Sequence, residues 1–208
     1  MRTDRVIAVV TVAIGVLGAV AAQLGAAEAD RTLALAATTA LSIISIGLPF
    51  IGAQIGVRYR RTAAQPAYRE AYVWALLLGA IGLAAALLIA VLIPSSSGDQ
   101  WQYAPVIVLG AFVTQLVAQT TGIGLGVLLG RAWIAGVLTI VIPLGLYFAL
   151  PESVRAFFAP YASAQLWWSG EFGLGDLLPF LVMVALWGPV LHFVAWSRTK
   201  SAVGASSR

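Results

Sequence analysis

Apolar residues fall into six long runs, and the charged residues gather in the short gaps between these runs. Each run has about 19 residues or more, which lets an α-helix cross a hydrocarbon core about 30 Å thick. The pattern predicts an all-α membrane protein with six transmembrane helices in a single domain, residues 1–208. The expected spans are 6–27, 33–57, 71–93, 104–130, 132–150 and 177–196.

The composition supports this prediction. Of the 208 residues, 61% are hydrophobic and only 10% are charged, and the mean hydropathy is +0.94. So few polar side chains cannot cover a water-soluble globule of this size, and the lipid bilayer is expected to be the solvent. The chain has no cysteine, which excludes disulfides, thiolate metal sites and cysteine catalysis.

The charged gaps alternate between basic and acidic along the chain. Basic residues favour the cytoplasmic side, so this alternation predicts that both termini are cytoplasmic and that Arg31 and Arg155 are the only basic residues outside. The net charge of +4 follows from the same bias and does not indicate a nucleic-acid partner. The expected cytoplasmic residues are Arg2, Arg5, Arg58, Arg60, Arg61, Arg69, Arg131, Arg198, Lys200 and Arg208.

The first run could also be read as a cleaved secretory signal. It exceeds the usual apolar core of about 7 to 15 residues in such signals, which favours a membrane span. The preference for Arg over Lys and the abundance of Ala, Gly, Val and Leu are typical of GC-rich bacterial genomes such as those of actinobacteria. We therefore expect a multi-pass protein of the bacterial plasma membrane.

Two gaps are longer than simple turns. The basic gap 58–70 reads RYRRTAAQPAYRE, and the gap 151–176 between the fifth and sixth runs is rich in aromatic residues. The second gap is expected to form either an interfacial loop or a pair of short re-entrant helices, because aromatic rings favour the headgroup region and its Pro and Gly residues interrupt helices. The residues that carry this expectation are Phe157, Phe158, Pro160, Tyr161, Trp167 and Trp168.

The middle of each run has no charged residue, although ion-coupled transporters and proton pumps normally carry charges there. The fourth run contains the neutral polar residues Thr114, Gln115, Gln119, Thr120 and Thr121. Gln115 and Gln119 share a helix face because they are four residues apart. These residues either form a polar wall of a substrate path or make interhelical hydrogen bonds.

No residue pattern indicates an enzyme. His192 is the only histidine, and it has no other ligand at metal-binding spacing. Ser169, the only candidate nucleophile to pair with it, lies in the outer gap without the preceding glycine of a G-x-S-G motif. Glycines in the first and fourth runs indicate close helix contacts. They are Gly15, Gly18, Gly122, Gly124, Gly126 and Gly130.

The order of these features resembles the permease subunit of ABC-2-type ATP-binding-cassette exporters over nearly the whole chain. The stretch LSIISIGLPFIGAQIGVRYRRTAAQPAYREAYVWALLLG joins the second run, a basic loop and the third run in the family's manner. The stretch TTGIGLGVLLGRAWIAGVLTIVIPLGLYFAL, with its short inner turn, and the outer segment FFAPYASAQLWWSG are also similar to that family.

The resemblance implies a subunit without catalytic residues or bound cofactor, since ATP and Mg²⁺ belong to a partner ATPase at the cytoplasmic face. It also implies a second permease copy or paralogue, and an amphipathic or lipid-like cargo such as a peptide antibiotic, drug or lipid. The docking residues would be Arg58, Arg60, Arg61, Arg69 and Glu70, although their charges are equally explained as topology signals.

Two other classes remain open from the residues alone. A small six-span substrate-binding component of an energy-coupling-factor importer has a similar length and needs no charge in the membrane. A non-catalytic membrane scaffold is the third class. The cargo and the direction of transport are not specified by any motif in the chain.

Overall fold

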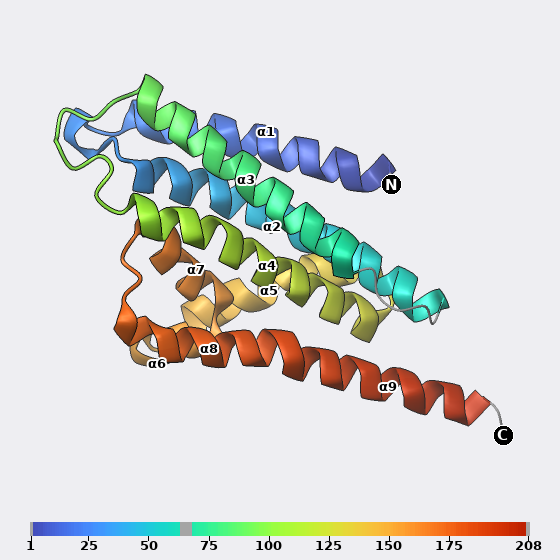
Figure 1. The fold of residues 1–208 in the computed structure, drawn as a ribbon. Coiled ribbons are helices and arrows are strands. Elements are labelled where there is room, and N and C mark those ends of the chain that lie inside the picture. The colour runs from blue at the N-terminus through green and yellow to red at the C-terminus, as the bar shows by residue number, and fades with distance from the viewer. Residues whose placement is uncertain (1, 63–67, 207–208) are drawn as a thin grey trace.

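The computed structural model describes residues 2–62 and 68–206, and every regular element in this part of the chain is helical. Figure 1 shows the helices as an elongated bundle. The long helices are α1 (Arg2–Gly25), α2 (Leu33–Thr62), α3 (Tyr68–Leu92), α4 (Ala104–Leu129) and α5 (Ala132–Ala149). They are followed by α6 (Glu152–Phe158), α7 (Pro160–Ser169), α8 (Leu177–Ala185) and α9 (Leu191–Ser206).

Three short turns complete the described elements. Two are 3₁₀ turns, η1 (Glu28–Asp30) and η2 (Leu174–Asp176). The third, η3 (Leu186–Val190), is a π-helical turn that joins α8 to α9 and contains Pro189. Figure 1 shows α8 and α9 as one continuous long helix. Pro189 has no N–H to donate within the helix, and a local π adjustment is one way in which membrane helices tolerate a proline.

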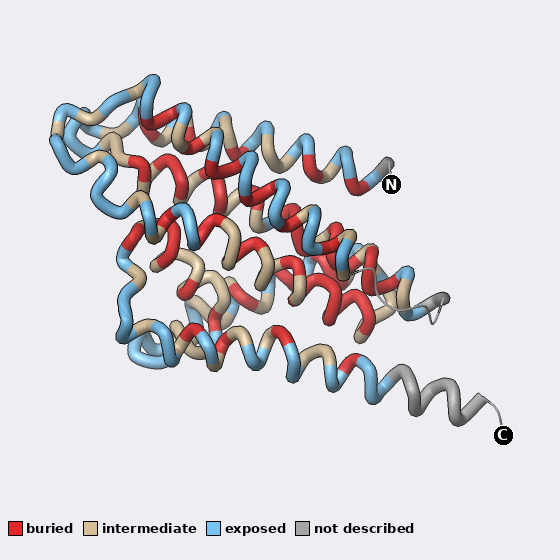
Figure 2. The backbone as a smooth tube through the Cα atoms, in the orientation of Figure 1, coloured by how far each residue is buried: buried red, intermediate tan, exposed pale blue. Residues whose placement is uncertain are grey.

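The prediction of six membrane-spanning helices is confirmed by length and apolar composition. Within the described residues, six helical segments are apolar enough to cross a bilayer: Thr3–Gly25, Leu33–Arg60, Tyr68–Leu92, Ala104–Leu129, Ala132–Ala149 and Leu174–Arg198. Their outward surfaces carry large apolar side chains, including Leu17, Leu88 and Phe148. Figure 2 shows buried residues concentrated on the inward faces of the helices and exposed residues on the outward faces. The chain is a multi-pass helical membrane protein.

The two ends of the bundle differ in their charge and in their connections. The start of α1, the end of α2 and the end of α9 lie at one end, as Figure 1 shows. We call it the basic end, because Arg58, Arg69 and Arg131 lie there. The opposite end holds the α1–α2 and α3–α4 connections and the helix α6. We call it the hairpin end.

Among the described helices, α2 and α4 make the most extensive contact. A Cβ added at Gly122 of α4 would lie 2.3 Å from the carbonyl oxygen of Pro49, and one at Gly126 would lie 2.4 Å from that of Ala53. The contact is reciprocal, since a Cβ at Gly56 of α2 would lie 2.3 Å from the carbonyl oxygen of Ile123. Glycine allows such close approach because it has no side chain. We call this contact the glycine seam; Gly52 belongs to it as well.

The remaining long helices pack around α2 and α4. Helix α1 lies on α2, where Gly15 would bring a Cβ within 3.0 Å of the Ala40 carbonyl oxygen. Helix α3 contacts both α2 and α4, and Gly79 approaches the Ala111 carbonyl oxygen in the same way. Helix α5 packs on α2 and α4, whereas α9 packs on α4. The bundle therefore surrounds the glycine seam.

The gap between the fifth and sixth spans forms a helical hairpin of α6 and α7. Ser163 of α7 is buried and donates a hydrogen bond of 2.9 Å to the Ala156 carbonyl oxygen of α6. Trp187 of η3 donates its indole N–H to the Phe158 carbonyl oxygen at 2.9 Å. The tip of the hairpin therefore lies against the last helix at its π turn, and α7 packs against α4.

The glycine seam yields a prediction about stability. Gly122→Ala adds a methyl group where the Pro49 carbonyl leaves no room, and overpacking of this kind costs about 1–3 kcal/mol. Gly145→Ala in α5 is the matched control, because no atom lies within 4 Å of the added methyl group. Thermal unfolding in detergent should show a lowered melting temperature for Gly122→Ala and an unchanged or raised one for Gly145→Ala. Equal melting temperatures for the two variants would contradict the seam.

Candidate functional site

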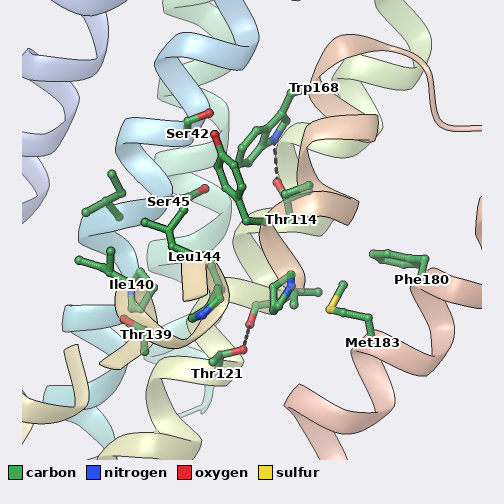
Figure 3. Close-up of a pocket in the computed structure, with 18 residues that line it drawn as sticks. Ser42, Ser45, Thr114, Thr121, Thr139, Ile140, Leu144, Trp168, Phe180 and Met183 are labelled. Carbon is green, nitrogen blue, oxygen red and sulfur yellow. Dashed lines mark hydrogen bonds between the residues drawn. The ribbon is translucent and has the colours of Figure 1, made fainter. Parts of the chain in front are cut away.

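A cavity of about 270 Å³ lies between the helices of the bundle, and residues of five helices line it (Figure 3). Helices α2, α4, α5, α7 and α8 each contribute to its wall. Most of its surface is apolar, and no charged residue is among the described residues that line it. The lining residues are Ser42, Ser45, Ile46, Pro49, Thr114, Val117, Ala118, Thr121, Thr139, Ile140, Pro143, Leu144, Pro160, Tyr161, Ala164, Trp168, Phe180 and Met183.

The wall of the cavity toward the hairpin end is built around Trp168 of α7. Its side chain is 1% exposed, and its indole N–H donates a hydrogen bond of 2.9 Å to the hydroxyl oxygen of Thr114 (Figure 3). Thr114 in turn donates to the Gly110 carbonyl oxygen at 2.7 Å. A Cβ at Gly110 would lie 2.6 Å from Cβ of Trp167, so glycine at this position allows α7 to lie directly on α4.

The neighbouring Trp167 fixes the return from the hairpin to α8. Its ring stacks on Phe172 with a centroid distance of 3.8 Å and meets Phe180 edge-on at 5.6 Å. Both Trp167 and Trp168 are buried. The aromatic residues of this segment therefore act in part as core residues that pack the hairpin against the bundle, whereas Phe158 is 43% exposed.

The predicted polar face of α4 divides into two groups. Thr114 and Thr121 line the cavity, whereas Gln115 and Gln119 are fully buried and are not among its lining residues. Gln115 bridges helices, because its amide oxygen accepts a 3.1 Å hydrogen bond from the Ser45 hydroxyl and its amide nitrogen donates to the Leu41 carbonyl oxygen at 3.4 Å.

Gln119 and Thr120 make no such bridge. Both amide atoms of Gln119 are buried without a partner in the described part of the chain, and a Cβ at Gly52 would lie 3.2 Å from its amide oxygen. Thr120 donates to the Leu116 carbonyl oxygen of its own helix. An unpaired buried amide costs free energy, so Gln119 is a locally unfavourable group inside the glycine seam.

The basic gap 58–70 is largely helical. Helix α2 continues to Thr62 and α3 begins at Tyr68, so the gap is shorter than the apolar runs suggest. Arg58 and Glu70 form an ion pair of 3.1 Å across it, with side chains that are 50% and 36% exposed. Arg69 is exposed, and the side chain of Arg61 lies outside the described residues.

Arg60 has a different place from its neighbours. Its guanidinium donates hydrogen bonds to the carbonyl oxygens of Leu128 at 2.8 Å and Val127 at 3.3 Å. These carbonyls belong to the last turn of α4, which ends at Gly130 with φ of +66°. A cation at a helix C-terminus pairs with carbonyls that have no partner in the helix. Arg60 therefore ties the end of α2 to the end of α4.

A second cavity of about 500 Å³ lies toward the basic end, between α9 and the ends of α2, α3 and α4. His192 lines it, and Nδ1 of its ring lies 2.9 Å from the Gly188 carbonyl oxygen. The ring also lies 5.9 Å from that of Tyr68. Ser169 bonds to the Leu166 carbonyl oxygen within α7. No metal-binding group of His, Cys, Asp and Glu occurs among the described residues.

Sequence reasoning missed the contribution of α5 and α8 to the cavity. Thr139 and Met183 line it together with Pro143, and nothing in the local sequence of Thr139 or Met183 distinguishes them from other span residues. One signal was available: Pro49 and Pro143 interrupt two long apolar runs, and interrupted spans often mark a binding site. Comparison with protein-family models, curated proteins and solved structures finds no match to this chain.

The bond between Ser45 and Gln115 predicts a difference between two neighbouring serines. Ser45→Ala leaves the buried amide oxygen of Gln115 without its donor, at a cost of about 1–3 kcal/mol. Ser42→Ala is the matched control, because the Ser42 hydroxyl bonds only to the Thr38 carbonyl of its own helix. In thermal unfolding, the melting temperature should fall for Ser45→Ala and stay near wild type for Ser42→Ala. The reverse order would show that Gln115 does not hold α2 to α4.

Proposed function

We propose that the chain is the permease subunit of an ATP-driven exporter of the ABC-2 type in a bacterial plasma membrane. It pairs with a second permease copy or paralogue and with separate ATPase subunits that bind ATP and Mg²⁺. The cargo is apolar or amphipathic. One observation carries the proposal: the cavity has an uncharged lining from five helices, and the exposed charges lie at the ends of the helices.

An uncharged cavity favours an external source of energy. Ion-coupled transporters place titratable or charged side chains in the membrane, where they bind the coupling ion. The side chains of the described residues that line this cavity offer only hydroxyl groups, an indole and apolar groups. Movement of a cargo through it would therefore be driven by a partner protein that acts on the helices from the membrane surface.

The basic end is the proposed docking face for that partner. The exposed side chain of Arg69 and the half-exposed pair of Arg58 and Glu70 are available to a soluble protein there. Arg60 connects this end of α2 to the end of α4. Both helices line the cavity, so a displacement at the basic end would be transmitted to two of its walls.

We propose that the α6–α7 hairpin closes the cavity toward the outer face of the membrane, opposite the basic end. Four residues of α7, namely Pro160, Tyr161, Ala164 and Trp168, line the cavity. In this proposal α6 and α7 enter the membrane from the outer face and return to it, and both termini of the chain are cytoplasmic. A change in the position of the hairpin would then open the cavity toward the outside.

A substrate-binding component of an energy-coupling-factor importer is the second candidate. The observation that favours it is that one copy of the chain supplies residues from five helices to the wall of the cavity. Such a component binds its cargo tightly without an ATPase. A vitamin-like small molecule that stays bound through purification, with no ATPase contacting the chain directly, would support it over the exporter.

Co-purification from the native host tests the exporter proposal. The tagged chain, extracted in a mild detergent, should retain a stoichiometric ATPase that carries a Walker motif and hydrolyses ATP. Arg69→Glu should reduce the retained ATPase severalfold, because reversing a charge in an interface introduces repulsion. Arg131→Glu is the matched control, since Arg131 is also exposed at the basic end but precedes α5. Equal retention by both variants would place the ATPase elsewhere.

The absence of cysteine from the native sequence permits a direct test of orientation. Ser96→Cys in the α3–α4 connection should react with a membrane-impermeant maleimide in intact cells. Ser197→Cys in α9 should react only after the membrane is made permeable. Both positions are exposed. Labelling of Cys at 197 in intact cells would reverse the proposed orientation.

A further inference from the structure

The cavity is poor in hydrogen-bond donors. Each serine and threonine hydroxyl in its wall already donates its proton to the protein. Thr121 donates to the Val117 carbonyl oxygen at 3.0 Å, and Thr139 donates to the Gly136 carbonyl oxygen. The corresponding acceptors are the Thr38 carbonyl for Ser42, the Gln115 amide for Ser45 and the Gly110 carbonyl for Thr114.

The two other polar hydrogens in the wall are those of Trp168 and Tyr161. The Trp168 indole N–H is committed to Thr114. The Tyr161 hydroxyl oxygen accepts a 3.0 Å hydrogen bond from the Gln165 amide, which leaves its own proton as the available donor among the described lining residues. A carboxylate or phosphate requires several donors or a cation when it leaves water. The cavity offers neither, so it disfavours anions.

The cavity is at the same time rich in acceptors. Proline has no N–H, so the carbonyl four residues before it loses its usual helical donor. Pro49 and Pro143 each lie inside a helix, and the residues four before them are Ser45 and Thr139. Both of these residues line the cavity. Two carbonyls without their usual helical donor thus belong to residues that line the cavity, and the hydroxyl oxygens add further lone pairs.

The remaining wall suits an apolar body that bears a donor or a positive charge. The rings of Tyr161, Trp168 and Phe180 line it together with aliphatic side chains. Aromatic faces attract cations through the ring quadrupole. The volume of about 270 Å³ lies just below the range of about 300–1,000 Å³ that is typical of pockets for drug-sized ligands. It therefore fits a small molecule, or one end of a larger one.

From this balance of donors and acceptors, we infer that the cavity binds an apolar amine, as a small lipophilic cargo or as the amine-bearing end of a larger one, and rejects anions. The inference rests on the proposed transport function and names the cargo class for the same cavity. It narrows the lipid-like cargoes to those without an acidic headgroup. The ammonium would donate to the acceptors of α2 and α5, and the hydrocarbon would fill the apolar remainder.

Binding to the isolated chain tests this inference without any ATPase. The probes are octylamine, octanol and octanoate, which share one hydrocarbon chain and differ in the head group. Equilibrium binding is measured at neutral pH on the purified protein in phosphatidylcholine nanodiscs, with empty nanodiscs subtracted. Octylamine should bind about tenfold or more tightly than octanoate, because hydrogen bonds from a charged donor are among the stronger ones. Octanol should fall between the two.

Two substitutions assign the binding to the cavity. Ala118→Phe places a ring into the space that Ala118 lines and should abolish saturable octylamine binding. Ala80→Phe is the matched control, because Ala80 is exposed on α3, which does not line the cavity. Should Ala118→Phe fail to fold, Ala164→Phe in α7 fills the same cavity from another helix. Monodisperse elution and the melting temperature report on folding for each variant.

The outcomes separate the inference from the proposed function. Equal binding of all three probes, tighter binding of octanoate, or octylamine binding that survives a filled cavity would each overturn the inference. None of these results affects recruitment of an ATPase, which is measured independently. If the tagged wild-type chain retains no ATPase but still binds octylamine, the exporter proposal is refuted and the amine site remains.

Discussion

The arrangement of this bundle depends on the contact of α2 with α4 through glycine. Inside a bilayer, association of helices gains little from the hydrophobic effect, because lipid tails are as apolar as leucine. Close packing has to supply the attraction. Gly52 and Gly56 on one helix and Gly122 and Gly126 on the other allow the backbones to approach until a methyl group would no longer fit. The other long helices are then placed by their contacts with this pair.

Polar interactions act along the same pair of helices and give the seam its register. Arg60 bonds to the final carbonyls of α4 at the basic end. The hydroxyl of Ser45 meets the amide of Gln115 farther along. Backbones that could otherwise slide past one another are held at these two points. The cavity lies beside this fixed pair, so two of its walls are set by the seam and the others by α5, α7 and α8.

The sequence predicts the spans well and the cavity poorly, for a physical reason. Hydropathy over about 19 residues depends only on local composition, and the six helices follow it to within a few residues, apart from the extensions of α2 and α9. The cavity, in contrast, depends on which faces of the five lining helices are turned toward one another. Thr114 and Gln115 are neighbours in the sequence, yet one lines the cavity and the other is buried against α2. The polar character of the two side chains alone does not predict which of them lines the cavity.

Trp187 donates its indole hydrogen bond to the Phe158 carbonyl from the π turn of the last helix. The rest of this helix is α-helical. A π turn holds one residue more than an α turn of the same height, so its position along a helix sets the rotation of everything beyond it. A shift of one residue rotates a side chain by about 100°, which would carry the indole away from its acceptor. The winding of the last helix and the position of the hairpin tip are therefore coupled through this hydrogen bond.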